Sequence, residues 1–261
     1  QIMHMFTVII IGLAMGTTVR LGRAIGAKDK NEASKTIGNT FTLFALTAIV
    51  ATFILLLANR SIVSMIDTPP KAVKGTIAYL RICFIGIPFI IAYNIIASIF
   101  RGLGDSKSPM YFVIVACVAN IVLDYIFIGH FGLGPSGAAL GTTLSQMISV
   151  IIAAIVIRRK SLLNISGQDL RPERRTMGGI LKIGIPVALQ DGFIQIAFIA
   201  ITAIANGRGL NDAAAVGIIE KFIGLLFIVP SAMLATVSAM AAQNIGAKRP
   251  ERARKTMEYA I

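Results

Sequence analysis

Seven stretches of about 20 mainly apolar residues divide this chain, and they restrict its fold more than any other feature. A backbone inside the hydrocarbon of a bilayer must satisfy its own hydrogen bonds, so each stretch is expected to form a helix. A hydrophobic content of 56% with 14% charged residues agrees with burial in lipid. The sequence therefore predicts an all-α integral membrane protein. Its expected spans are residues 2–19, 37–58, 75–100, 110–129, 136–157, 180–205 and 213–242.

A short repeat shows how these spans are grouped. The tetrapeptide Ile-Gly-Ala-Lys occurs at 25–28 and again at 245–248, each time between an apolar span and a basic loop. Six spans take the chain from one copy to the next, so both copies are expected to run in the same direction through the membrane. Two such six-helix halves are then related by an axis along the membrane normal. A complete protein of this kind would have roughly 420–450 residues, and this chain would be a fragment holding about helices two to eight of twelve.

The repeat also predicts the domain organisation. Residues 1–160 are expected to form most of an amino-terminal lobe, with helices two to six. Residues 161–179 are expected to be a cytoplasmic linker, and residues 180–261 the start of a carboxy-terminal lobe, with helices seven and eight.

The net charge of +13 is distributed as in a membrane protein. Nineteen of the 25 basic residues fall in alternate loops, which the positive-inside rule places in the cytoplasm. This distribution argues against a nucleic-acid partner. Cys83 and Cys117 lie within spans and lack metal-ligand spacing. There is no nucleophile–His–acid set and no phosphate-binding loop, so we expect neither an enzyme nor a bound cofactor.

Polar residues inside the predicted spans are the candidates for function, because an ionisable group in lipid is costly. Asp124 is the strongest, and Asn120 lies one turn earlier on the same helix face. Thr142, in the returning helix, is expected at a similar depth. A carboxylate, an amide and a hydroxyl at one level would suit a proton or a hard cation such as Na⁺. The alternative is an Asp near a helix end that only hydrogen-bonds a neighbouring helix.

A second candidate set lies in the span at 180–205. Asp191 is near the middle of this span, with Gln190 and Gln195 beside it. It is expected to face a substrate cavity or to be paired, and Lys221 on the next helix is one possible partner. The pair Glu220-Lys221 is also compatible with a place near the outer surface, with the lysine reaching into water.

Three motifs together resemble the multidrug and toxic compound extrusion (MATE) transporters. They read RGLGDSKSP at 101–109, NIVLD at 120–124 and GLGPSGAALGT at 132–142. The duplicated Ile-Gly-Ala-Lys loops also fit this family.

The resemblance implies a twelve-helix, two-lobe antiporter that exports small organic or drug-like compounds across the cell membrane in exchange for H⁺ or Na⁺. It implies a cation site that uses the residues matching Asn120, Asp124 and Thr142, together with an Asp of the first helix. Some members carry a glutamate where this chain has Ile194, with Asp191 and Gln195 nearby, so the resemblance does not by itself assign a second-lobe coupling acid. The expected partners are the lipid bilayer and a small organic substrate, in a monomer of a bacterial inner membrane. The alternative is a flippase for lipid-linked saccharides of the same superfamily, which would be expected to line its cavity with cations.

Overall fold

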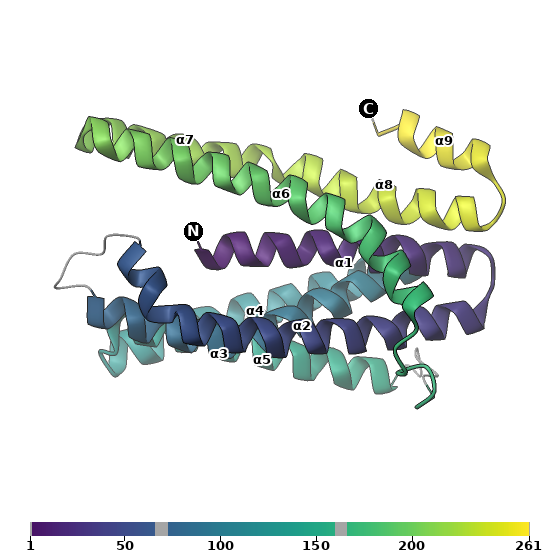
Figure 1. Ribbon diagram of the computed structural model, residues 1–261, viewed down its shortest axis with the longest axis horizontal. Helices are drawn as coiled ribbons and strands as arrows, with labels where there is room; N and C mark the ends of the chain where they lie inside the picture. Colours follow the sequence, from purple (N-terminus) through teal and green to yellow (C-terminus); the bar gives the residue numbers. More distant parts are fainter. Residues whose placement is uncertain (1, 66–72, 160–165, 261) are drawn as a thin grey trace. The chain divides into compact units, whose positions relative to one another are not determined.

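The computed structural model describes residues 2–65, 73–159 and 166–260, and every regular element in these ranges is a helix (Figure 1). In chain order they are α1 (Ile2–Gly26), α2 (Lys30–Met65), α3 (Val73–Leu103), α4 (Lys107–Asp124), η1 (Tyr125–His130), α5 (Gly134–Arg159), α6 (Arg174–Arg208), α7 (Leu210–Leu226), α8 (Ile228–Gly246) and α9 (Pro250–Glu258). The element η1 is a π-helical continuation of α4.

The prediction of seven membrane spans is confirmed. Seven helical segments of the described chain are long and apolar enough to cross a membrane, with α4 and η1 forming one segment and α7 and α8 another. The helices extend beyond the predicted apolar limits because polar residues at both ends continue the helical hydrogen bonding. The span predicted at 213–242 is interrupted at Phe227, where α7 ends. Pro230 explains this break, since it lacks an N–H and its ring clashes with the carbonyl four residues earlier.

The helices form two compact units, which we describe separately. Unit 1 contains residues 1–36, 101–104 and 174–261, and unit 2 contains residues 37–100 and 105–173. Contact density therefore groups α1 with α6 to α9. The lobes at 1–160 and 180–261 are derived from the sequence repeat, whereas the two units are defined by contacts. The division into lobes therefore stays a prediction.

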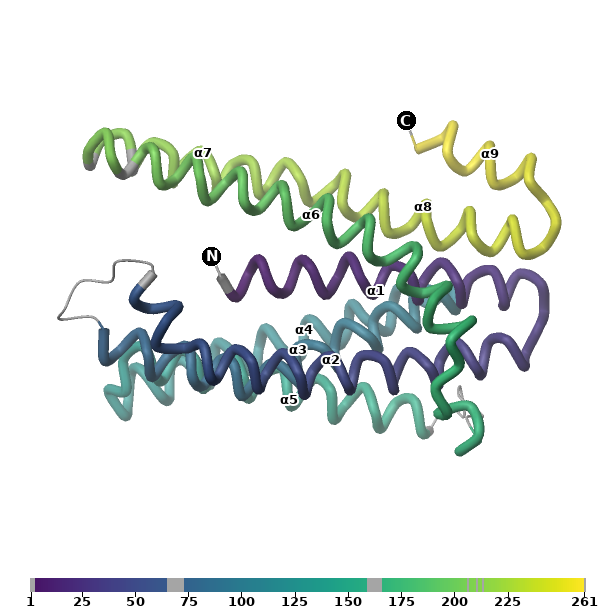
Figure 2. The backbone as a smooth tube through the Cα atoms, viewed as in Figure 1, coloured from purple at the N-terminus to yellow at the C-terminus, as the bar shows by residue number. Residues whose placement is uncertain are grey.

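Unit 1 is built on a close crossing of α1 and α8, which lie side by side in Figures 1 and 2. A Cβ built on Gly26 would overlap the carbonyl oxygen of Gln243, and one built on Gly246 would overlap the carbonyl oxygen of Arg23. Gly22 faces Ala242, with 3.1 Å between its ideal Cβ and that of the alanine. With an offset of 220 residues between the copies, residues 22, 23 and 26 correspond to 242, 243 and 246. Each of the three contacts thus joins residues from equivalent parts of the two copies. The crossing is therefore a pseudo-two-fold interface between the two copies.

The turns that follow the crossing are duplicated down to their hydrogen bonds. Lys28 and Lys248 both adopt a left-handed backbone conformation, with φ of 58° and 56°. The N–H groups of Ala27 and Ala247 each donate to the carbonyl four residues earlier, at 2.9 Å in both copies. Such a left-handed residue just after a helix satisfies carbonyls that the helix leaves unpaired. The duplication predicted from the tetrapeptide is confirmed for these two turns.

Small residues also bring α6 onto α1 within unit 1. A Cβ on Gly16 would overlap the carbonyl oxygen of Ile180, and one on Gly184 would overlap that of Leu13. An ideal Cβ on Gly12 would lie 2.7 Å from the backbone of Ala188. In lipid there is little hydrophobic drive between helices, so close backbone approach through small residues is a main source of packing energy.

Unit 2 has its apolar core where α3, α4 and α5 meet. Ile96, Phe100, Phe112 and Ala153 are buried together, and the two phenyl rings pack edge to face with centroids 5.5 Å apart. Ser149 adds a hydrogen bond from α5 to the carbonyl of Phe112, at 2.9 Å. This core holds the hairpin that carries Asp124.

The described part of the expected linker is attached to the start of α2. The Asn39 side chain donates to the carbonyl of Asp169 at 3.3 Å and accepts from the N–H of Glu173 at 2.7 Å. Thr42 donates to the carbonyl of Leu170 at 2.7 Å. Residues 160–165 of this region lie outside the described chain.

Replacing Gly26 by alanine should destabilise the full-length protein, because the new methyl group overlaps the α8 backbone. Overpacking of this kind costs about 1–3 kcal/mol. Thermal or denaturant unfolding in detergent measures the change. Gly224→Ala on α7 is the matched control, since nothing lies within 4 Å of its added Cβ and alanine is the better helix former. Equal losses in both variants would contradict the crossing.

Candidate functional site

Asp124 lies at a change of helix type in unit 2. It is the last residue of α4 and immediately precedes the π-helical turn η1. Single π turns within longer helices are frequent at functional sites. The candidate carboxylate therefore lies where the backbone hydrogen bonding changes from the α-helical to the π-helical pattern.

One polar atom of Asp124 and one of Asn120 are buried without a hydrogen-bond partner. Asp124 Oδ1 and Asn120 Nδ2 are both inaccessible and unpaired, one helical turn apart on α4. An unpaired buried donor or acceptor costs about 1–3 kcal/mol, and a charged one more. Such atoms in a native structure mark a place where a polar partner or a cation would be stabilising.

The carboxylate of Asp124 rests directly on the backbone of α5. A Cβ built on Gly141 would overlap Asp124 Oδ1, and one built on Gly137 would lie 3.1 Å from the carbonyl oxygen of Phe127 in η1. Gly137 and Gly141 are four residues apart, so they share one face of α5. The absence of side chains on this face is what lets the carboxylate fit between the helices.

Thr142 is placed differently from its expected position beside Asp124. Its side chain is exposed, and no donor reaches Asp124 Oδ1. Its neighbour Thr143 is buried against α3, with Oγ1 2.6 Å from an ideal Cβ on Gly86. In the structure Asn120 and Asp124 thus lie one turn apart on α4, whereas the side chain of Thr142 is on the exposed face of α5. The three-residue cation set stays a prediction.

Tyr79 on α3 is a neighbour of the site that the sequence analysis missed. It interacts electrostatically with Asp124 and hydrogen-bonds Cys83, one turn along the same helix. The sequence does not indicate which residues of α3 face α4, because both helices are apolar on every side. The hydrogen bond of this phenol goes to Cys83, and its interaction with Asp124 is electrostatic.

The second candidate set is spread around α6 in unit 1. Asp191 and Gln195 are half-buried, and Gln190 is exposed. Gln190 and Asp191 lie about one turn after Pro186, which is inside the helix. Gly192, next to Asp191, is buried and faces Ile9 of α1. Their assignment to a substrate cavity also stays a prediction.

The neighbouring helix α7 presents Glu220, and not Lys221, to α6. Thr202 donates to Glu220 Oε1 at 2.7 Å, while Lys221 is exposed. Among the described residues no ion pair joins Asp191 to Lys221. Glu220 is the second residue whose role the sequence analysis did not predict, because the facing of α7 depends on its packing.

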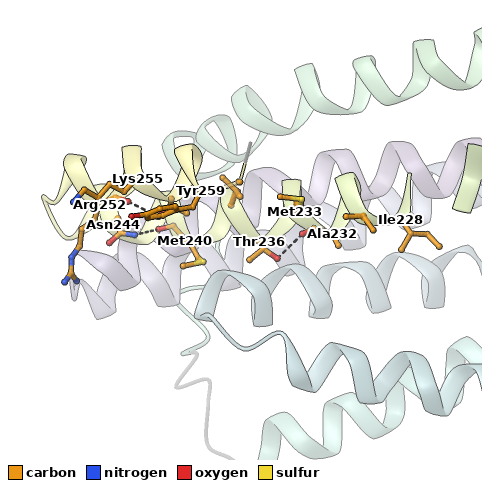
Figure 3. A pocket seen from close by; sticks show the side chains of 13 residues that line it. Ile228, Ala232, Met233, Thr236, Met240, Asn244, Arg252, Lys255 and Tyr259 are labelled. Carbon is orange, nitrogen blue, oxygen red and sulfur yellow. Dashed lines mark hydrogen bonds between the residues drawn. The ribbon is translucent and has the colours of Figure 1, made fainter. Parts of the chain in front are cut away.

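A separate groove of about 770 Å³ lies between α8 and α9 (Figure 3). Its floor is apolar and includes Ile228, Met233 and Met240, and Arg252 and Lys255 of α9 lie at one end. It contains none of the candidate acids. In the ranges that the structure describes, no cluster of three or more His, Cys, Asp or Glu residues could hold a metal ion.

These features define a class, that of polytopic helical membrane proteins built by parallel duplication, with a carboxylate in one hairpin. The profile of the MatE family matches residues 1–126 and 186–261, and the chain belongs to this family. Members of the family are transporters and not enzymes.

Two relatives and one solved structure illustrate the similarity. The chain is 28% identical over 259 residues to the "Probable multidrug resistance protein YoeA" of Bacillus subtilis (strain 168), covering 96% of this chain and 56% of the relative. It is 34% identical over 188 residues to the "Probable multidrug resistance protein YpnP" of the same strain, covering 72% of this chain and 42% of that relative. The crystal structure of MATE in complex with MaL6 superimposes with a TM-score of 0.89 at 28% identity, covering 99% of this chain and 58% of that one. The chain thus spans about half the length of these proteins.

A double-mutant cycle tests the contact between Asp124 and Gly141. Gly141→Ala alone should destabilise the full-length protein by about 1–3 kcal/mol, because the methyl group overlaps the carboxylate. Asp124→Ala removes the overlapping oxygen, so the double variant should recover part of that loss in thermal unfolding. Gly75→Ala on α3, whose added Cβ meets an ordinary 3.9 Å contact, should show no coupling to Asp124→Ala. Strictly additive losses for Gly141→Ala and Asp124→Ala would contradict the contact.

Proposed function

We propose that the full-length protein is a cation-coupled exporter of small organic compounds that works by alternating access. Membership of the MatE family supports a transporter, and the names of two relatives as multidrug resistance proteins support drug-like substrates. Neither relative is named for lipid-linked saccharides, so the flippase alternative is not favoured. The proposed location is a bacterial inner membrane, with the protein acting as a monomer.

The observation that carries the coupling proposal is the buried, unpaired Oδ1 of Asp124. A carboxylate in an apolar bundle is stable only if it is protonated, paired or bound to a cation. A proton would turn Oδ1 into a hydroxyl that needs an acceptor. A Na⁺ ion would instead take oxygen ligands, which Asp124 and the amide oxygen of Asn120 can supply.

The neighbouring residues would set the selectivity of this site. The Asn120 side chain can offer either its oxygen to a cation or its N–H groups to the carboxylate. Thr142 is the proposed third ligand. Its side chain lies on the exposed face of α5 in the same hairpin, so the cation would bind it from that face. Release of the cation would leave an uncompensated charge, and this cost would favour a conformation in which the site is hydrated.

Asp124→Asn in the full-length protein tests the proposal. The change keeps the size but removes the charge, so ion-driven efflux of a cationic dye from cells should fall more than tenfold while expression persists. Asn120→Ala and Thr142→Ala each remove one neutral ligand, and losses of about two- to tenfold are expected. Transport by each variant is measured under an imposed H⁺ gradient and, separately, a Na⁺ gradient.

Asp191→Asn is the matched control, since it removes a carboxylate from α6. If Asp124→Asn transports normally under the same gradients while Asp191→Asn is inactive, coupling does not run through Asp124.

A further inference from the structure

A pocket of about 650 Å³ with charged residues in its lining lies in unit 1, at the end of the bundle where α1 and α8 stop and where α2 and α6 begin. The charge bias of the loops predicts that this end faces the cytoplasm. Part of its wall is apolar, with Ala24, Ala27, Ile183 and Ile245. The charged lining residues are Arg20, Arg23, Asp29, Glu32 and Lys182.

Both acids of the pocket are already engaged. Glu32 forms an ion pair with Arg20, with 2.5 Å between Oε1 and Nη2. Asp29 accepts a hydrogen bond from the N–H of Glu32 at 3.0 Å and so caps the start of α2. A carboxylate in this position is also stabilised by the helix dipole. The charge of Glu32 is thus paired with Arg20, and one oxygen of Asp29 is occupied by the backbone of α2.

The remaining cations of the pocket are not compensated. In the part of the chain that the structure describes, Arg23 and Lys182 have exposed side chains and form no ion pair. Arg20 is fixed by Glu32 and by a 3.4 Å hydrogen bond to the carbonyl of Arg175, yet its buried Nε–H has no partner. With three basic residues against two acidic ones, the lining of the pocket carries a net positive charge, and the exposed cations Arg23 and Lys182 are open to a ligand.

We propose that this pocket binds a phosphate group, supplied by the headgroup of an anionic lipid or by free phosphate. Phosphate oxygens accept charge-assisted hydrogen bonds from guanidinium and ammonium groups, and arginine is especially suited to them. Basic pockets between transmembrane helices on the cytoplasmic side are a known setting for anionic headgroups. The apolar wall beside the cations would suit the start of an acyl chain. The inference is independent of the coupling role proposed for Asp124.

The repeat shows that this pocket is not a by-product of the duplicated fold. At the positions equivalent to Arg20, Arg23 and Glu32, the second copy has Met240, Gln243 and Arg252. The backbone turns of the two copies match, so the charged arrangement belongs to the first copy alone. An arrangement that the duplication does not require is consistent with a specific ligand.

The test uses the purified full-length protein in a neutral detergent, with thermal unfolding followed by circular dichroism. Phosphatidylglycerol, phosphatidylcholine and inorganic phosphate are titrated separately at constant ionic strength. We expect phosphatidylglycerol or inorganic phosphate to raise the unfolding midpoint, and phosphatidylcholine to do so less. A response to phosphatidylglycerol alone identifies a lipid headgroup as the source, and a response to inorganic phosphate identifies free phosphate.

The double variant Arg23→Gln, Lys182→Gln should need about 30-fold more of the effective ligand for the same shift, since each basic residue near the membrane surface contributes about a fivefold factor. Arg171→Gln with Arg174→Gln is the control, because both are exposed cations outside the pocket and the change in net charge is equal. This control should respond like the unmodified protein.

Three results would overturn the proposal. One is the absence of any shift with either phosphatidylglycerol or inorganic phosphate. Another is an unchanged response in the double variant. The last is an equal loss in the control, which would indicate unspecific charge attraction.

Discussion

The close approach of two helix backbones at glycine positions is the contact on which unit 1 depends. Where α1 crosses α8, Gly26 and Gly246 each lie against a carbonyl group of the opposite helix, and Gly22 faces Ala242. Van der Waals packing and weak C–H···O contacts are the forces available there, because lipid offers little hydrophobic drive between helices. A single methyl group at Gly26 or Gly246 would separate the backbones. The crossing also carries the duplicated turns, so it joins the two copies at equivalent points.

Glycine has a second use in unit 2, where it makes room for a charge. The carboxylate of Asp124 fits against α5 because Gly141 has no side chain, and it remains without a hydrogen bond at Oδ1. An apolar bundle does not normally retain such an atom, since its cost is a sizeable part of the stability of a protein. A site that is costly when empty and stable when a cation is bound is what ion coupling requires. The stability of this hairpin and the proposed transport cycle therefore depend on the same carboxylate.

Much of the fold could be predicted from the sequence, because lipid requires continuous apolar helices and these are visible in the chain. The tetrapeptide at 25–28 and 245–248 also predicted the parallel duplication, since turn geometry depends on local residues. The facing of side chains could not be predicted, as helices that are apolar all round give no periodic signal. For this reason the sequence predicted Thr142 beside Asp124, whereas in the structure Gly141 contacts the Asp124 carboxylate. For the same reason the sequence did not predict the interactions of Tyr79 and Glu220. The break at Phe227 has a local cause in the sequence, since Pro230 follows it by three residues.

Disulfide cross-linking of Gly22→Cys with Ala242→Cys tests the pseudo-two-fold crossing most directly. In a cysteine-free background of the full-length protein, mild oxidation in native membranes should link the pair. The Cβ of Ala242 lies 3.1 Å from the ideal Cβ on Gly22, so a small outward shift brings the two cysteines into the disulfide range of about 3.5–4.5 Å. Cleavage at a protease site engineered between the two positions would then leave the halves joined until reduction. Gly22→Cys with Ala232→Cys should not cross-link, because position 232 lies about 15 Å further along α8. Failure of the Gly22–Ala242 pair to link, or equal linking of both pairs, would contradict the account.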